Sequence, residues 1–240
     1  MAKKDSLLKT IAVYDKLGAK YADQIAHVRL PQLQEFIDML PNNAQVLDVG
    51  CAAGRDSAIL QNAGFRVMGI DLSERFLELA RERIHGVEFQ YMDARRLSFE
   101  QETFNGIWTH AVLLNLDRSE ILGVLQGFWK IMKPGGICFV GVKAGEGKKF
   151  IGEALVDNMK RRETYFGKSE MEELLNDAGF KIERSCIYGD MLGRPTTKWV
   201  YIFAKKNIAN RMENIIRKRK YRIIFGSLKK EGKYAKTKIS

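Results

Sequence analysis

The sequence predicts one α/β domain with a mostly parallel sheet and helices on both of its faces. Short apolar runs next to glycine, such as residues 46–49 and 137–142, have the length and composition of buried strands. Segments with apolar residues at helical spacing alternate with these runs along the chain. The 240 residues, of which 45% are hydrophobic, are sufficient for one complete core.

The expected elements follow from the N-terminus. Residues 5–40 are helical, with Pro31 in the first turn of a second helix that reaches Met39. Ser73 is the expected N-cap of a helix with apolar residues at helical spacing. Residues 144–167, rich in Gly, Lys and Glu, are expected to form a partly mobile active-site loop with a short helix. The remaining strands are expected at 46–49, 66–70, 87–91, 106–109, 137–142, 181–187 and 198–204, and the remaining helices at 57–63, 120–132 and 169–178.

A strand, a glycine turn and the start of a helix predict a nucleoside pocket. Gly50 and Gly54 have no Cβ atom, so the backbone can turn sharply and approach a ligand. Asp71 follows the next expected strand, beside this turn, where its carboxylate can accept both hydroxyl hydrogens of a ribose. Nicotinamide dinucleotides and S-adenosylmethionine both use this geometry, but the turn lacks the third glycine of the dinucleotide fingerprint. Asp48, inside the first strand, would repel phosphates and therefore favours a cationic ligand.

Further motifs follow in order along residues 10–205. Residues 90–94 end in Asp93 and Ala94, residues 104–116 read FNGIWTHAVLLNL, and residues 132–136 read MKPGG. Together with the glycine turn and Asp71, they resemble the class I S-adenosylmethionine-dependent methyltransferases, in particular the type 11 and type 25 methyltransferase domains. The resemblance implies a Rossmann-like sheet of seven strands with an antiparallel last strand. It also implies S-adenosylmethionine as the cofactor and a helical cap or lid in residues 1–40.

The resemblance implies which residues bind the cofactor. Asp71 would hold the ribose, Leu72 would pack against the adenine, and Asp93 would meet the adenine amino group. Cys51 lies between glycines and is expected to be a small packing residue rather than a nucleophile. The complete expected cofactor set is Tyr14, Tyr21, Arg29, Asp48, Gly50, Cys51, Ala52, Gly54, Asp71, Leu72, Asp93, Ala94, Thr109 and His110.

Four of these residues have two interpretations. Tyr14 and Tyr21 resemble a lid element of the family, or pack one helix onto the core. Arg29 reaches the methionine carboxylate of the cofactor, or is solvated. His110 lies just past the fourth strand, where the methyl group would emerge, so it is the candidate catalytic base. The alternative is a histidine with a structural role only.

The acceptor side is expected after the fourth and fifth strands. Asn115 stands where many family members have His, and Asn105 where the family has Asp, so the sequence predicts no acid or base role at either position. Trp108 and Trp199 are expected in the core or in the pocket wall. The expected acceptor-binding residues are Asn115, Lys143, Glu146, Arg162 and Tyr165. For the last four, the alternative is an exposed position on the protein surface.

The net charge of +11 is concentrated in the last 34 residues. Residues 207–240 hold 11 Lys and Arg against two Glu, whereas residues 1–206 hold 29 basic and 27 acidic residues. Apolar residues recur at helical spacing in this basic segment, which predicts an amphipathic C-terminal tail. The expected organisation is therefore a methyltransferase domain in residues 1–206 followed by a basic tail in residues 207–240.

The leading hypothesis is metal-independent transfer of a methyl group to an oxygen or nitrogen of a small-molecule acceptor. The three cysteines are far apart and lack CxxC spacing, so neither a zinc site nor a disulfide is expected, and no magnesium-type cluster is evident. One alternative is an RNA methyltransferase, for tRNA or rRNA, that binds phosphates through the tail. Another is a peripheral membrane or partner-binding protein whose tail contacts anionic lipid.

The remaining expectations concern location and assembly. The sequence has no signal-like leader and no apolar run of membrane-spanning length, which predicts a cytoplasmic protein. Its pattern does not predict an oligomeric state.

Overall fold

The structure is a computed structural model that describes residues 2–153 and 159–209. The predicted basic tail lies outside the described residues from residue 210 onward. No helix within the described ranges is long and apolar enough to cross a membrane.

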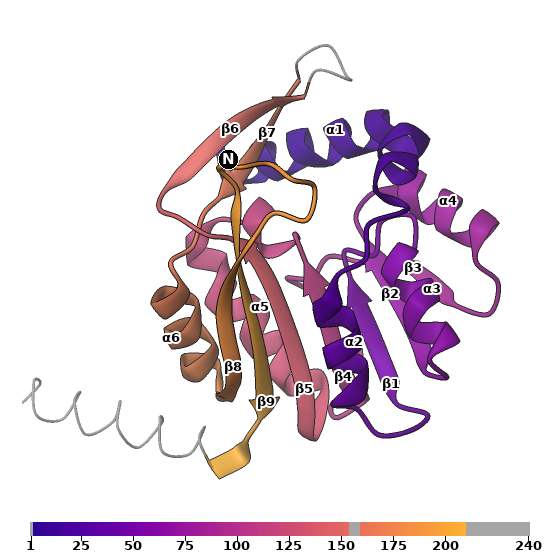
Figure 1. The fold of residues 1–240 in the computed structure, drawn as a ribbon, viewed down its shortest axis with the longest axis vertical. Helices are drawn as coiled ribbons and strands as arrows, with labels where there is room; N and C mark the ends of the chain where they lie inside the picture. The colour runs from indigo at the N-terminus through magenta and orange to yellow at the C-terminus, as the bar shows by residue number, and fades with distance from the viewer. Residues whose placement is uncertain (1, 154–158, 210–240) are drawn as a thin grey trace, which may run out of the picture.

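A seven-stranded sheet forms the centre of the fold, in the order β3-β2-β1-β4-β5-β9-β8 (Figure 1). Strands β1 to β5 pair in parallel, whereas β9 runs antiparallel to both of its neighbours, β5 and β8. This arrangement confirms the predicted seven strands and the antiparallel last strand. The strands are β1 (Gln45–Val49), β2 (Arg66–Asp71), β3 (Glu88–Tyr91), β4 (Phe104–His110), β5 (Met132–Lys143), β8 (Phe180–Gly189) and β9 (Lys198–Lys206).

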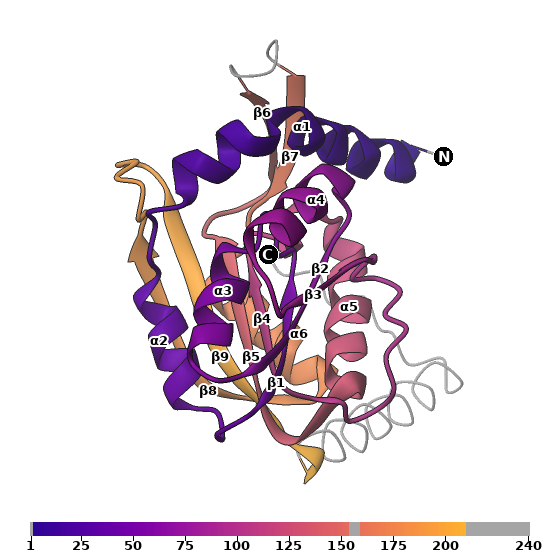
Figure 2. The same cartoon turned by 90° about the vertical axis from the view of Figure 1, so that its right-hand side faces the viewer.

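Helices cover both faces of this sheet (Figure 2). On one face, α2 and α3 pack on a core cluster that includes Phe36, Leu60 and Trp108. On the other face, α5 and α6 pack on a larger cluster that includes Phe128 and Leu175. The helices are α1 (Ala2–Ile25), α2 (Pro31–Asp38), α3 (Arg55–Asn62), α4 (Glu74–Arg83), α5 (Arg118–Ile131) and α6 (Lys168–Ala178), with a short 3-10 turn, η1 (Leu113–Asn115).

The predicted loop with a short helix at residues 144–167 is wrong for the described part of that segment. Strands β6 (Lys148–Glu153) and β7 (Met159–Thr164) pair there as an antiparallel hairpin, separate from the main sheet. The hairpin has no apolar alternation because three successive residues of β7, Arg162, Glu163 and Thr164, are polar and buried on both faces of the strand. Hydrophobic periodicity, which identifies most strands, is therefore missing from these two.

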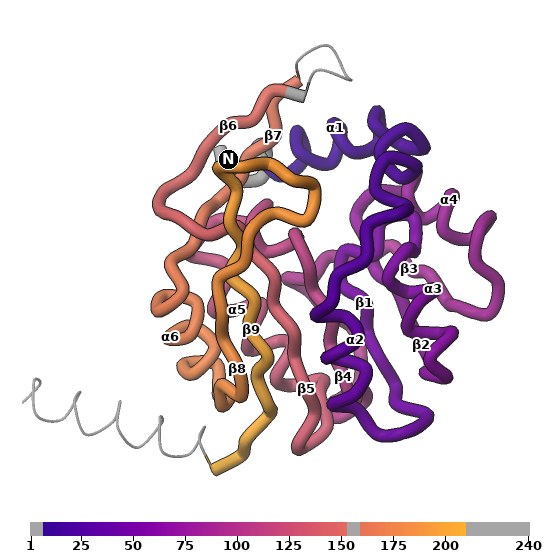
Figure 3. Tube along the Cα trace, in the orientation of Figure 1, coloured from indigo at the N-terminus to yellow at the C-terminus, as the bar shows by residue number. Residues whose placement is uncertain are grey.

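Helix α1 crosses above the carboxyl ends of the parallel strands, between β7 and α4 (Figure 1). Its path bends at Gly18, whose φ of 44° and ψ of −128° are not helical, and beyond α1 the chain turns down toward α2 (Figure 3). The backbone N–H of Arg162 donates to Thr10 Oγ1 at 3.3 Å, which ties α1 to the hairpin. At the other side, Ser73 Oγ donates to Asp15 Oδ1 at 2.6 Å. These contacts hold α1 over the edge of the sheet.

Replacing Ser73 by Ala should lower the free energy of unfolding by about 1 to 2 kcal/mol. Ser73 is the N-cap of α4, as predicted, because its Oγ accepts from the Phe76 N–H at 3.2 Å, and the same oxygen donates to Asp15. Urea denaturation measures the change. The control is Ser169→Ala at an exposed position near the start of α6, and an equal loss in both variants would contradict the capping role.

Candidate functional site

A cavity of about 780 Å³ is lined by residues at the carboxyl ends of the parallel strands and by residues of α1. The turns after β1 and β2 form one half of its wall, which we call the donor half, with Asp48 and Asp71. The ends of β5, β7 and the β8–β9 loop form the other half, which we call the acceptor half, with Lys143 and Glu163. Ligands of open α/β sheets bind in the crevice at this edge.

Asp71 is held in place by main-chain donors in the donor half. The N–H of Ala52 donates to Oδ2 at 3.0 Å and the N–H of Ser73 donates to Oδ1 at 2.9 Å. Burial raises the pKa of Asp71, and these two bonds offset part of the shift. A carboxylate oxygen has two lone pairs, so each oxygen can accept one further hydrogen bond. Two adjacent hydroxyl groups of a ribose fit this acceptor pair.

The glycine turn brings main chain close to Asp71. Gly50 has a φ of 70°, and a Cβ atom there would lie 2.2 Å from Val112 Cγ2. Gly54 has a φ of 80° at the start of α3, and a Cβ atom there would lie 2.3 Å from Ile84 Cδ1. Both positions therefore require glycine for packing and for backbone conformation. Gly50 lines the cavity, whereas Gly54 lies behind it.

Asp48 shares the donor half with a second buried carboxylate that sequence reasoning missed. Burial and the neighbouring charge of Asp56 raise the pKa of Asp48, which accepts from Ser57 Oγ at 2.6 Å. Burial alone would raise the pKa of Asp56 too, but Arg55 lowers it through bonds of 2.7 and 2.9 Å. Trp108 Nε1 also donates to Asp56 at 3.0 Å. The one signal in the sequence for this buried carboxylate is that Asp56 directly follows Arg55, a residue of opposite charge.

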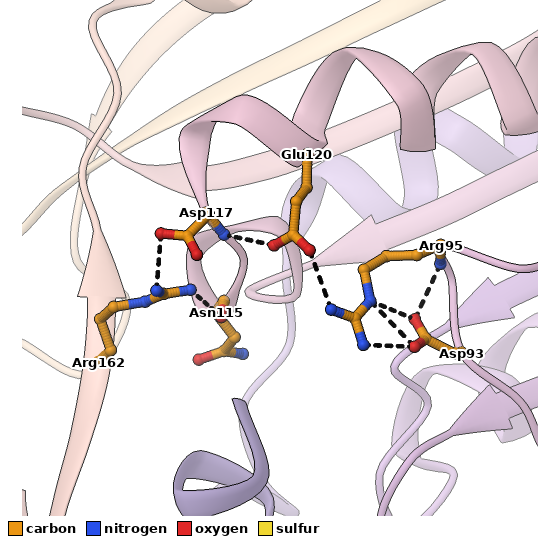
Figure 4. Close-up of polar contacts among 6 residues, drawn as sticks. All are labelled: Asp93, Arg95, Asn115, Asp117, Glu120 and Arg162. Atoms are coloured by element: carbon orange, nitrogen blue, oxygen red, sulfur yellow. Dashed lines mark hydrogen bonds and ion pairs between the residues drawn. The ribbon is translucent and has the colours of Figure 1, made fainter. Parts of the chain in front are cut away.

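Asp93 lies at the donor half and is held by Arg95 (Figure 4). Arg95 donates through Nε and Nη2 to the Asp93 carboxylate at 2.6 to 2.9 Å, and through Nη1 to Glu120 at 3.0 Å. Burial alone would raise the pKa of Asp93, but the Arg95 hydrogen bonds outweigh it and lower that pKa. A ligand amino group would therefore meet a charged carboxylate that is already oriented.

His110 belongs to an aromatic cluster formed with Trp199 and Tyr201. Its ring stacks on Trp199 at 4.6 Å between centroids and lies 5.8 Å from Tyr201. His110 and Tyr201 pair across Gly141 in neighbouring strands, and a Cβ atom on Gly141 would lie 2.6 Å from His110 Cδ2. All three rings line the cavity. Among the described residues, His110 Nε2 and Tyr201 OH are buried without a hydrogen-bond partner.

The ring of His110 is neutral at pH 7. Burial lowers the pKa of His110 from 6.5 to about 4, and the charge of Asp56 offsets part of this shift. A neutral imidazole has one nitrogen that can accept a proton. His110 is therefore unprotonated at pH 7 and can accept a proton, but a pKa of about 4 lies below the range near the operating pH in which a general base is most effective.

A buried ion cluster closes the acceptor half. Glu163 is fully buried and bonds to Lys143 Nζ at 2.5 Å, to Arg161 Nη1, and to Tyr165 OH at 3.2 Å. Arg161 Nη1 also donates to Tyr14 OH at 3.5 Å. Sequence reasoning predicted Lys143 but missed Arg161 and Glu163, because they lie in β7, which was expected to be a loop or helix.

The aromatic residues of α1 pack on α4 and face the cavity, and their role as a lid element stays a prediction. Tyr14 and Tyr21 line the cavity. Their rings lie 5.9 Å apart between centroids, and each lies 6.0 Å from the ring of Phe76. Burial raises the pKa of Tyr14 above its usual range. Arg29 is exposed at the rim, where Nη1 donates to Ala26 O at 2.6 Å and to Val28 O at 3.2 Å.

The cavity brings together most of the predicted residues. The predicted residues that line it are Tyr14, Tyr21, Arg29, Asp48, Gly50, Cys51, Ala52, Asp71, Leu72, Asp93, Ala94, His110, Asn115 and Lys143. Among residues 2–153 and 159–209, no group of three or more His, Cys, Asp or Glu side chains is placed to hold a metal ion. The metal-independent reaction stays a prediction.

Five predicted residues, Gly54 among them, are outside the cavity wall. Thr109 is buried on the opposite face of β4 from His110, because side chains alternate along a strand. Arg162 is buried and donates to Asp117 Oδ1 at 2.8 Å and to Asn115 O at 3.0 Å (Figure 4). Glu146 is exposed, and Tyr165 reaches the ion cluster only through its bond to Glu163.

The donor half fits the predicted cofactor. Asp71 offers the acceptor pair for a ribose, and Asp48 and Asp71 bring acidic groups to a site for a sulfonium cation. The volume is within the range of pockets for drug-sized ligands, roughly 300 to 1,000 Å³.

Comparison with known proteins agrees with this geometry. Residues 46–136 match the family model described as a methyltransferase domain. The protein YqeM of Bacillus subtilis is 26% identical over 131 residues, which cover 52% of this chain and 53% of YqeM. Phosphoethanolamine N-methyltransferase 3 of Arabidopsis thaliana is 30% identical over 159 residues, which cover 63% of this chain and 32% of that enzyme. The chain thus spans about half of the first relative and about a third of the second.

A solved structure shows the same fold. It is the 1,6-didemethyltoxoflavin-N1-methyltransferase of Burkholderia thailandensis with bound 1,6-didemethyltoxoflavin and S-adenosylhomocysteine. The TM-score is 0.67 at 19% identity, and the match covers 86% of this chain and 91% of that chain.

The imidazole of His110 should titrate near pH 4 instead of near 6.5. The unfolded chain then binds this proton at a higher pH than the folded chain, so His110 should make stability fall as the pH drops from 6.5 to about 4. NMR titration of the imidazole Cε1–H signal measures the pKa, and loss of the signal in His110→Gln assigns it. A midpoint at or above 6.5 would contradict the burial of this ring.

Proposed function

We propose that the chain is a class I methyltransferase, which transfers the methyl group of S-adenosylmethionine to an oxygen or nitrogen of a small-molecule acceptor without a metal. The observation that carries the proposal is the Asp71 carboxylate, whose two oxygens each accept one main-chain N–H and keep a lone pair for a ribose hydroxyl. It lies beside the glycine turn, within the residues that match the methyltransferase domain.

Each half of the cavity has one task in this reaction. When bound, S-adenosylmethionine supplies an electrophilic methyl group on a sulfonium with a good leaving group. Asp71 orients the ribose, and Asp48 adds an acidic group to the wall near it. The aromatic cluster of His110, Trp199 and Tyr201 limits the access of water. His110, whose ring lines the cavity, takes the proton that an acceptor hydroxyl or ammonium must lose, and its buried Nε2 reaches the acceptor once the ring turns toward the cavity.

A small-molecule acceptor is favoured because side chains of α1, β7 and the β8–β9 loop all line the cavity. Arabidopsis phosphoethanolamine N-methyltransferase 3 and the Burkholderia N1-methyltransferase carry the names of small-molecule acceptors. The alternatives of RNA and of anionic lipid both depend on the tail, whose residues 210–240 lie outside the described part of the chain. Those two functions stay predictions from the sequence.

The proposed function is tested by incubating the full chain with S-adenosylmethionine labelled in the methyl group and with pools of small metabolites or bulk RNA. Label should move into a low-molecular-weight product. Label found only in RNA would replace this proposal by the RNA hypothesis. If no pool receives label and the chain does not bind S-adenosylhomocysteine, both the small-molecule and the RNA hypothesis are wrong.

Asp71→Asn should weaken the affinity for both S-adenosylmethionine and S-adenosylhomocysteine by at least about tenfold, because an amide offers one acceptor oxygen without the charge. Isothermal titration calorimetry measures both affinities. The matched control is Asp38→Asn, an exposed position at the end of α2, which should bind as the unmodified chain does. Equal affinities in all three proteins would refute the ribose contact.

His110→Gln should lower kcat for the identified acceptor by about 10² while the affinity for S-adenosylhomocysteine stays unchanged. The loss should shrink as the pH rises, since an acceptor that has already lost its proton needs no base. The control is His85→Gln, on an exposed turn outside the cavity wall. An unchanged kcat and pH profile in His110→Gln would remove His110 from the chemistry.

A further inference from the structure

We propose that the methyl acceptor carries an uncharged apolar group beside its reacting oxygen or nitrogen, and that the β8–β9 loop (residues 190–197) binds this group through Met191 and Leu192. Asp190 is the positioning residue of the loop. The inference rests on the proposed function and narrows it to a class of acceptor. Two independent observations carry it: apolar side chains that are exposed at the cavity wall, and a buried carboxylate that holds them in place.

The β8–β9 loop presents apolar side chains to water at the cavity. Met191 and Leu192 both line the cavity wall and are 47% and 46% exposed. Tyr188, near the end of β8, is 40% exposed. Apolar side chains that are exposed singly need no explanation, but a group of them beside a cavity indicates a binding surface. An apolar part of a ligand would cover this surface and be removed from water itself.

The apolar surface continues into the cavity along β9. Between centroids, the ring of Tyr201 lies 5.9 Å from that of Tyr188 and 6.2 Å from that of Trp199. Trp199 stacks on His110 at 4.6 Å, and the rings of Trp199, Tyr201 and His110 line the cavity. A ligand whose reacting atom lies at His110 would therefore have ring surface beside it and the apolar loop residues beyond that.

One carboxylate holds the loop in its shape. Asp190 accepts from Trp199 Nε1 at 2.8 Å and from Arg194 Nε and Nη2 at 2.8 and 2.6 Å. It also accepts from the N–H groups of Leu192 at 3.1 Å and Arg194 at 3.3 Å, and its side chain is 2% exposed. Burial alone would raise the pKa of Asp190, but the hydrogen bonds from Arg194 and Trp199 outweigh it and lower that pKa. The carboxylate is therefore charged at neutral pH and keeps these bonds.

The same bonds fix the apolar loop residues relative to the aromatic cluster. Asp190 joins the indole of Trp199, in the cavity wall, to the main chain of Leu192. Gly193 completes the turn with a φ of 71°, and its N–H donates to Asp190 O at 3.1 Å. A surface that is already ordered loses less conformational entropy when a ligand binds. Asp190 thus acts on the acceptor through Leu192 and Trp199.

The charge of the cavity favours neither an anionic nor a cationic acceptor. The described wall contains as many carboxylates as Lys and Arg side chains. Within the loop, Asp190 and Arg194 form an ion pair with each other at 2.6 Å. Apolar contact is therefore the property by which this loop can distinguish one acceptor from another.

The test measures binding of matched phenols to the full chain saturated with S-adenosylhomocysteine. The probes are 4-propylphenol, 4-(2-hydroxyethyl)phenol and 4-(2-aminoethyl)phenol, whose side chains are equal in length and end in methyl, hydroxyl and ammonium. Calorimetry should rank 4-propylphenol above both others by about tenfold or more, because only its end group gains affinity on leaving water. Equal or tighter binding of either polar probe, or no binding of 4-propylphenol, would overturn the proposal.

Variants of the loop locate the propyl group. Met191→Gln combined with Leu192→Gln should weaken 4-propylphenol by about tenfold and change 4-(2-hydroxyethyl)phenol by less than about twofold. The control is Phe150→Gln, at an exposed apolar position of β6 outside the cavity wall. No change in the double variant, or an equal loss in the control, would contradict the role of the loop. A changed oligomeric state with unchanged 4-propylphenol binding would assign the apolar residues to a protein interface instead.

Asp190→Ala tests the positioning role. It should shift the Nε1–H NMR signal of Trp199, which is assigned by its loss in Trp199→Phe, and abolish the preference for 4-propylphenol. Asp190→Asn keeps an acceptor oxygen for the indole and should retain part of the preference. An unshifted indole signal in Asp190→Ala, or an equal loss for all three phenols in both variants, would contradict this role.

Binding of S-adenosylhomocysteine to each variant keeps the two proposals separate. If a variant binds this product normally, it is folded and its phenol result stands. If the loop variants weaken S-adenosylhomocysteine by the same factor as 4-propylphenol, the loop serves the cofactor or the fold, and the acceptor proposal is wrong. If the unmodified chain does not bind S-adenosylhomocysteine at all, the proposed function fails first.

Discussion

The site depends on three carboxylates at the carboxyl ends of β1 and β2 and at the start of α3, two of them buried and that of Asp71 half-buried. Asp48, Asp56 and Asp71 lie within one small region, and each is held by donors that the local chain supplies, from Ser57, from Arg55 and from the main chain of Ala52 and Ser73. Buried charges persist only where such donors surround them. The turn after β1 must therefore keep its shape, and the cavity above it takes its acidic character from that turn.

The donor half was predictable from the sequence because its parts are local. The glycines, Asp48 and Asp71 occur within two consecutive strand-turn-helix units, and the register of β1 on β2 places them together. The N-cap at Ser73 and the helix end predicted at residue 178 were found in the same way. Ser73 caps α4, and α6 ends at Ala178, before Gly179 with its φ of 108°. Local rules of this kind need no knowledge of distant pairing.

The acceptor half was only partly predictable because its residues meet through long-range pairing. Trp199 and Tyr201 reach His110 across β5, and the sequence gives no measure of that register. Glu163 and Arg161 lie on a strand whose buried face is ionic, so its pattern predicted a loop. Side chains alternate between the two faces of β4, so His110 faces the cavity and its neighbour Thr109 faces away from it. A shift of one residue in any of these strand registers would have turned other side chains toward the cavity.

Helix α1 is fastened to the rest of the chain mainly by side chains. Tyr14, Thr10 and Asp15 form hydrogen bonds to β7 and α4, and α1 contributes no strand to the sheet. Opening of α1 would leave the strand pairing intact, because the ladder bonds do not pass through it, but it would expose the buried side chains of Val13 and Leu17. The contacts of α1 then set the rate at which small molecules enter and leave the cavity, whereas the strands below set most of the free energy of unfolding. Evolution can change the first of these quantities without changing the second.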